Sequence, residues 1–190
     1  MRGTIYQQEG FSIIARILHW LMAIMVITML FVGAGMVATV SERYEWLMQL
    51  HRPLGISILL LVVIRIGIRM THGTPSLPSS LPMWQKIAAR LSHLMLYGLM
   101  VSMPLIGWAM ESAGGYPVTL FDGITLPVLV DASPGLYSTM NFLHTWLAYT
   151  LFFLVLIHFG AALFHALVKR DDVLSSMTTA ARPGVKRSGT

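Results

Sequence analysis

Residues 141–168 read NFLHTWLAYTLFFLVLIHFGAALFHALV, an apolar run without a charged residue that carries three histidines, His144, His158 and His165. The run is longer than the ~20 residues with which a helix crosses a bilayer. Because a helix rises about 1.5 Å and turns about 100° per residue, His158 lies about 21 Å deeper than His144, with an angular offset of only about 40°. His165 continues nearly the same face. The run therefore predicts a transmembrane helix with a line of imidazoles along one side.

Three more apolar segments of comparable length precede this run. The chain has 190 residues, of which 55% are hydrophobic and 11% are charged, and its mean hydropathy is +0.69. Soluble domains carry roughly 25% charged residues. We therefore expect an all-α membrane protein, a four-transmembrane-helix bundle formed by residues 13–40, 50–70, 87–110 and 141–168. We treat residues 1–180 as one domain and expect residues 181–190 to form a disordered cytoplasmic tail.

The connections and the composition narrow the possible functions. Gly and Pro interrupt residues 112–135, which we expect to form an ordered cap outside the membrane. The chain has no cysteine, which excludes disulfides, iron–sulfur clusters and thiolate metal sites. No nucleic-acid motif accompanies the net charge of +5, so we expect the lipid bilayer and no nucleic acid as a partner. The polar N-terminus lacks the pattern of a removable signal peptide.

The distribution of Lys and Arg predicts the orientation of the bundle. All basic residues except Arg43 and Arg52 fall in segments on the same side as the two termini. Cytoplasmic loops of membrane proteins carry an excess of Lys and Arg. We therefore expect both termini to be cytoplasmic and the long third loop to face the periplasm.

The histidines of different helices match in depth. The second helix begins on the outer side, which brings His51 to the depth of His144. The first helix begins on the inner side, which brings His19 to the depth of His158. The sequence thus predicts an outer pair, His51 with His144, and an inner pair, His19 with His158. Two further histidines are expected near the inner surface: His93 and His165.

Opposed histidines on different helices are what a haem held inside a helix bundle requires, one imidazole on each side of the iron. Gly55 lies one turn from His51, and Gly160 lies close to His158, so a flat macrocycle has room near both pairs. The absence of a CxxCH motif means that any haem is held non-covalently, as b type. The pattern predicts two haem b groups, with the four paired histidines as axial ligands of the iron.

A histidine-based metal carrier is the alternative reading from another functional class. Such a carrier would usually add Asp or Glu at membrane depth, and none falls inside the predicted spans. Arg65 shares the His51 face at inner depth, where it either pairs with a haem propionate or extends to the inner surface. Arg16 allows the same two interpretations.

Four segments resemble the prokaryotic cytochrome b561 family: LHW around His19, QLHRPLGISILLLVVIRIGIR around His51, ARLSHLMLYGLMVSMPLIGW around His93, and FLHTW with LIHFGAALFHALVKRDDVLSSM at the C-terminal end. The resemblance covers about residues 10 to 177. It implies a di-haem cytochrome b in the bacterial inner membrane that carries electrons between a periplasmic donor and the ubiquinone pool.

The resemblance also implies roles for individual residues. It gives the same histidine pairs as haem ligands, and it implies that His93 and His165 lie where quinone binds. Because imidazole titrates near physiological pH, His93 or His165 is also our candidate for delivering protons to the quinone.

The electron donor has more than one candidate. One branch of the family oxidises superoxide, and Arg52, directly after His51, is a candidate contact for that anion. The expected outer face carries two basic and five acidic residues, which suits a cationic periplasmic protein as donor. A further alternative is a cytochrome b subunit that anchors a larger dehydrogenase or hydrogenase.

Overall fold

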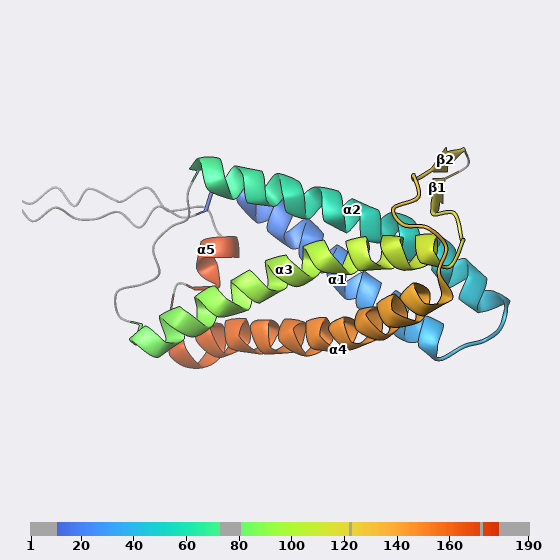
Figure 1. Cartoon of the computed structure of the whole chain (residues 1–190). Coiled ribbons are helices and arrows are strands. Elements are labelled where there is room, and N and C mark those ends of the chain that lie inside the picture. The colour runs from blue at the N-terminus through green and yellow to red at the C-terminus, as the bar shows by residue number, and fades with distance from the viewer. Residues whose placement is uncertain (1–10, 73–80, 122, 172, 179–190) are drawn as a thin grey trace, which may run out of the picture.

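The structure, a computed structural model, describes residues 11–72, 81–121, 123–171 and 173–178. Within these ranges four long helices form an antiparallel bundle (Figure 1): α1 (Ile13–Val37), α2 (Glu42–His72), α3 (Met83–Ala113) and α4 (Pro134–Phe164). Each is long and apolar enough to cross a membrane. The predicted all-α fold with four membrane-spanning helices is therefore confirmed.

Three of the helices begin earlier than their apolar runs. α2 starts at Glu42 instead of residue 50, α3 at Met83 instead of 87, and α4 at Pro134 instead of 141. Glu42 and Glu45 lie in the first turn of α2, where carboxylates interact favourably with the helix dipole. The Ser133 hydroxyl caps α4, and Pro134 occupies the first turn, where its missing N–H costs nothing. The starting residues of α2 and α4 therefore lengthen these two helices beyond their apolar segments.

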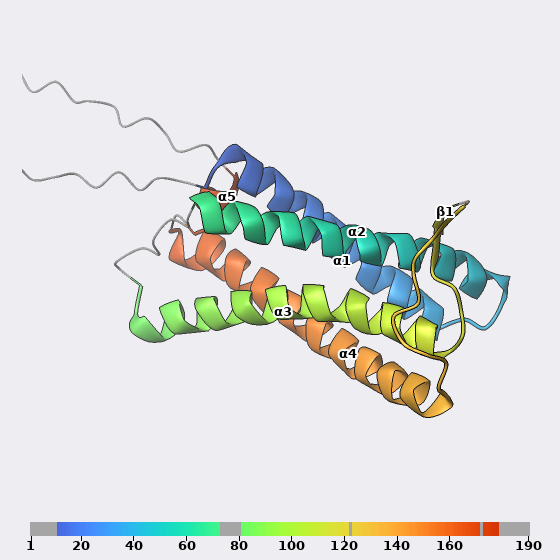
Figure 2. The same ribbon diagram turned by 45° about the horizontal axis from the view of Figure 1, so that its top comes forward.

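The bundle is built from two helical hairpins. α1 packs along α2, α3 packs along α4, and α2 contacts α3 between them (Figures 1 and 2). We call the end formed by the α1–α2 and α3–α4 connections the loop end, and the end at which α1 begins and α4 finishes the tail end. Val62 of α2 is fully buried. In the most apolar 18-residue stretch of each helix, however, at most 17% of the residues are buried inside the protein. Most apolar side chains therefore face outward, as in a bundle surrounded by lipid.

The α3–α4 connection forms a small cap at the loop end (Figure 1). It contains the antiparallel strands β1 (Thr119–Phe121) and β2 (Ile124–Thr125), with Thr119 opposite Thr125. The Trp108 indole donates to the Pro127 carbonyl at 2.9 Å, and the Ser112 hydroxyl accepts from the backbone N–H of Leu129. The end of α3 thus holds the cap in place.

The chain changes geometry after α4. Residues His165–Lys169 form one π-helical turn, η1, and Arg170 follows in the left-handed conformation with φ 53°. The short helix α5 (Ser175–Thr178) then docks against α1, where the Trp20 indole donates to the Met177 carbonyl at 3.0 Å. The start of α1 and the end of the described chain therefore meet at the tail end. The predicted disordered tail, residues 181–190, lies outside the described residues.

Candidate functional site

His51 and His144 face each other near the loop end. Their ring centroids are 6.1 Å apart, and the ring planes are inclined at 63°. His51 comes from α2 and His144 from α4, so the pair joins the two helical hairpins. The Nδ1 atom of His51 is buried without a hydrogen-bond partner among the described residues. A buried polar nitrogen without a partner is unusual, and it fits a site that takes a ligand.

His19 and His158 form a second facing pair toward the tail end. Their centroids are 6.4 Å apart with an interplanar angle of 71°. The His93 ring also contacts the His158 ring, with the two centroids 5.5 Å apart and the planes inclined at 62°. His158 therefore contacts rings from α1 and α3. The expected neighbourhood of His93 was the inner surface beside His165. Because α3 begins at Met83, His93 lies about 15 Å into the helix and reaches the depth of His158.

The separation within both pairs fits a metal bound between two imidazoles. An imidazole nitrogen binds a transition metal at about 2.0 Å, and the ring centroid lies roughly 1 Å behind it, so two axial rings stand roughly 6 Å apart. The two pairs, at 6.1 and 6.4 Å, match this spacing, whereas His93 and His158 are closer. No group of three or more metal-ligating side chains occurs in the described part of the chain. The arrangement suits a cofactor that supplies its own equatorial ligands, as haem does.

One glycine packs directly against a ring of the loop-end pair. A Cβ at Gly107 of α3 would lie 3.2 Å from Cε1 of His144, so the bare backbone passes directly beside that ring. A Cβ at Gly55 would meet the tip of Met29, and one at Gly160 would meet nothing within 4 Å. Gly107 was not singled out in the sequence, because its importance depends on the rotation of α3 relative to α4.

Arg65 joins three helices at the tail end. Its Nε donates to the Tyr97 hydroxyl of α3 at 2.9 Å, and one terminal nitrogen donates to the Ala15 carbonyl of α1 at 2.8 Å. The part-buried side chain therefore links α1, α2 and α3 near the tail end. The Nε of Arg16 is buried without a partner among the described residues.

Arg52 is held by an acidic residue that sequence reasoning assigned only to the outer surface. Its guanidinium donates to the Glu111 carboxylate of α3, and Glu111 is 8% exposed. The predicted third helix stopped at Met110, one residue short of Glu111. The observed helix continues to Ala113 and brings this carboxylate inside the bundle. An anion approaching Arg52 must therefore compete with a carboxylate already in place.

His165 is paired as well. Its Nδ1 lies 2.6 Å from a carboxylate oxygen of Asp171, beyond the π-helical turn. Burial tends to raise the pKa of Asp171, but the hydrogen bonds from His165 and the Val173 backbone, with the charge of Lys169, hold it below the ordinary value. The carboxylate therefore stays ionised at neutral pH and can fix the orientation of the imidazole.

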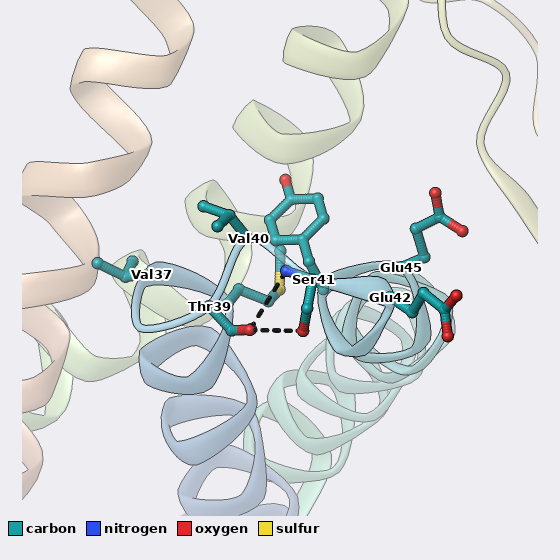
Figure 3. Close-up of a pocket in the computed structure, with 8 residues that line it drawn as sticks. Val37, Thr39, Val40, Ser41, Glu42 and Glu45 are labelled. Atoms are coloured by element: carbon teal, nitrogen blue, oxygen red, sulfur yellow. Dashed lines mark hydrogen bonds between the residues drawn. The ribbon is translucent and has the colours of Figure 1, made fainter.

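A shallow hollow of about 440 Å³ lies at the α1–α2 turn, lined by residues between Met36 and Glu45. Figure 3 shows Glu42 and Glu45 together on one side of it and Val37 on the other. A hydrogen bond between the Thr39 and Ser41 hydroxyls shapes the turn. No histidine lines this hollow, so it lies apart from the paired imidazoles.

Comparison with known proteins gives a consistent set of relatives. A family model described as prokaryotic cytochrome b561 matches residues 10–180. Cytochrome b561 homolog 2 of Escherichia coli (strain K12) is 33% identical over 173 residues, which cover 89% of this chain and 91% of that protein. Homolog 1 of the same organism is 30% identical, over 84% of this chain and 92% of its own length. A Yersinia pestis protein named "Probable superoxide oxidase CybB" is 30% identical, over 84% of this chain and 90% of its own length.

Proposed function

The chain belongs to the prokaryotic cytochrome b561 family, and from this premise we propose that it is a di-haem membrane cytochrome b that passes electrons from a donor at the loop end to ubiquinone at the tail end. Membership in the family makes membrane electron transfer the class of activity. The observation that carries the di-haem proposal is the presence of two facing histidine pairs, one toward each end of the bundle.

Each pair would hold one haem b. His51 and His144 are the ligands at the loop end, and His19 and His158 are the ligands toward the tail end. Haem held by these histidines would supply one-electron redox chemistry. The protein contributes the spacing of the rings and an apolar surrounding that limits solvent access. Gly107 contributes the space beside His144.

Arg65 is the proposed partner of a haem carboxylate. Two of its nitrogens already bind Tyr97 and the Ala15 carbonyl, which fixes the guanidinium inside the bundle. Its remaining terminal nitrogen has no bond to the described residues and can donate to a carboxylate. Arg16, with its buried unpartnered Nε, is a second candidate for the same role.

Quinone reduction consumes two electrons and two protons. We assign proton delivery to the tail end, where the His165 imidazole is oriented by Asp171 and the His93 ring lies on His158. A histidine whose Nδ1–H is fixed by a carboxylate presents its other nitrogen in a defined direction. This arrangement suits transfer of a proton to a bound quinone oxygen.

Superoxide is the candidate donor that the Yersinia pestis relative's name supports. In that reaction two superoxide ions each lose one electron to become O2, and one ubiquinone takes up the two electrons with two protons. A cationic protein is the second candidate. The charge of the described loop end supports it, since Glu42, Glu45 and Asp131 are exposed there together with the single exposed cation Arg43.

The same charge distribution supports an inner-membrane orientation with both termini cytoplasmic. In the described residues the tail end carries most of the basic side chains, namely Arg16, Arg65, Arg69, Lys86, Arg90, Lys169 and Arg170. Positively charged ends of membrane helices remain on the cytoplasmic side.

The proposal is tested first by a reduced-minus-oxidised absorption spectrum of the detergent-purified protein, with haem quantified as its pyridine complex. We expect two b-type haems per chain. One haem would contradict one of the two ligand pairs. A colourless protein that cannot be reconstituted with haem would overturn the proposal.

A further inference from the structure

Arg52 and Glu111 form an ion pair between α2 and α3 at the loop end. Arg52 directly follows His51 in α2. Glu111 lies in the last turn of α3, where its backbone carbonyl accepts a hydrogen bond from Tyr116 of the cap. The carboxylate is therefore held against the histidine-bearing helix α2, with little access to solvent.

This ion pair neutralises the positive charge of Arg52, the cation that directly follows His51 in the sequence. Among the described residues the loop end has two cations, Arg52 and Arg43. Arg43 is exposed between Glu42 and Glu45 in the first turn of α2. Opposite charges in contact cancel at longer range, so an approaching anion meets no net attraction from Arg52. The exposed acidic residues around it then dominate the surface potential.

We propose that Glu111 determines the charge of the electron donor, because it holds the Arg52 guanidinium and so favours neutral or cationic donors over small anions. This inference rests on the proposed function, since it concerns the donor side of that electron-transfer protein. Without the carboxylate, Arg52 would present an unpaired charge beside His51. Its side chain is 25% exposed, so water can solvate the freed guanidinium and an anion can reach it.

The experiment compares an anionic and a cationic one-electron donor by stopped-flow reduction of the purified holoprotein at low ionic strength. The anionic donor is the sulfur dioxide radical of dithionite, and the cationic donor is the methyl viologen radical. In Glu111→Gln the ratio of the anionic to the cationic rate should rise about three- to tenfold, a modest share of what full electrostatic steering provides. In the double variant Arg52→Gln/Glu111→Gln, the ratio of the anionic to the cationic rate should return to within about twofold of the wild-type ratio.

Glu45→Gln is the matched control, because it removes one negative charge from the same end without freeing Arg52. Its rate ratio should change by less than about twofold. If Glu45→Gln and Glu111→Gln change the ratio equally, bulk charge explains the effect and the proposal is wrong. A redox titration supplies a readout independent of rates. The midpoint potential of one haem should rise in Glu111→Gln, and rise less in Glu45→Gln.

If Glu111→Gln does not retain haem, the dependence of the wild-type reduction rates on ionic strength tests the proposal instead. With Arg52 paired, reduction by the anionic donor should stay constant or accelerate as ionic strength increases, and reduction by the cationic donor should slow. A steep loss of the anionic rate with salt would overturn the proposal. Failure of the proposed function would look different, because the wild-type protein would then lack two reducible haems altogether.

Discussion

His165 and Asp171 face each other at the tail end, with the imidazole Nδ1 2.6 Å from the carboxylate oxygen. The π-helical turn and the left-handed Arg170 bring the chain back on itself, so that two residues six positions apart can meet. The N–H of Val173 donates to the second oxygen of the carboxylate. The geometry of this turn therefore fixes the imidazole from outside the membrane-spanning part of α4.

Replacing Asp171 should impair quinone reduction without removing haem. In Asp171→Asn the imidazole loses a charged acceptor that orients it, and we expect the rate of quinol formation to fall about 10- to 100-fold. The measurement is steady-state quinone reduction together with the pyridine-haem content. Asp131→Asn, an exposed substitution in the cap, is the control and should change neither value when the electron donor is uncharged. An unchanged rate in Asp171→Asn would contradict a proton role for this pair.

The contribution of Asp171 to stability should depend on pH in a defined direction. Its pKa is lowered in the folded protein, so the unfolded chain binds the proton more readily. The contribution is therefore complete above the ordinary aspartate pKa of about 3.9 and disappears as pH falls through the lower folded value. The difference in Tm between the wild type and Asp171→Asn should therefore shrink as pH falls below about 4. A difference that stayed undiminished at acidic pH would contradict this contribution.

A single substitution at any of the four paired histidines should remove one haem, and the two variants of one pair should lose the same haem. His51→Ala and His144→Ala are each expected to lower the haem content from two per chain to one, and to leave the same residual spectrum. His19→Ala and His158→Ala should leave the other spectrum. In the proposed assignment the two histidines of a pair bind the same iron, so the double variant within a pair should lose no more haem than either single variant.

His93→Ala tests whether His19 or His93 binds the same iron as His158, since the His93 ring lies closer to His158 than the His19 ring does. It should retain both haems, because its distance from His158 is too short for a metal between the rings. Loss of haem from His93→Ala with retention in His19→Ala would reverse the assignment.

The sequence predicts the helical pairing of the histidines better than it predicts the helix ends. His51 and His144 could be matched in depth because each helix has a fixed rise per residue. Glu111 was misjudged because a hydropathy argument stops near the first charged residue, whereas the backbone hydrogen bonds of α3 continue to Ala113. The depth of His93 differs from the expected depth for the same reason at the other end of that helix, because α3 begins at Met83 and not at residue 87.

Other contacts depend on how the helices are rotated about their axes. The spacing of residues along α3 identifies which ones share a face, but not which neighbour that face meets. The approach of Gly107 to His144 and the bond from Arg65 to Tyr97 are of this kind. The Asp171 contact depends on a π-helical turn, for which the sequence has no simple pattern.

Gly107→Ala should weaken the loop-end haem site selectively. The added methyl group would lie 3.2 Å from the His144 ring, which must shift to accommodate it. Gly98→Ala is a matched control in the same helix, since a Cβ there has no neighbour within 4 Å and the residue lies about half a turn away from the Gly107 face. Both changes raise helix propensity by up to about 1 kcal/mol. We expect loss of haem during purification in Gly107→Ala alone, and equal retention in both variants would contradict the close approach.

Arg65 should stabilise the bundle through its two hydrogen bonds and hold a haem carboxylate through its remaining nitrogen. Tyr97→Phe removes only the bond to the hydroxyl, and we expect a loss of about 1–2 kcal/mol in the free energy of unfolding. Arg65→Lys keeps the charge but cannot bind both partners and a carboxylate at once. It should destabilise the protein more than Tyr97→Phe and also shift the midpoint potential of the tail-end haem, as measured by redox titration. If Arg65→Lys and Tyr97→Phe give the same potential, Arg65 is a structural link between helices and not a partner of haem.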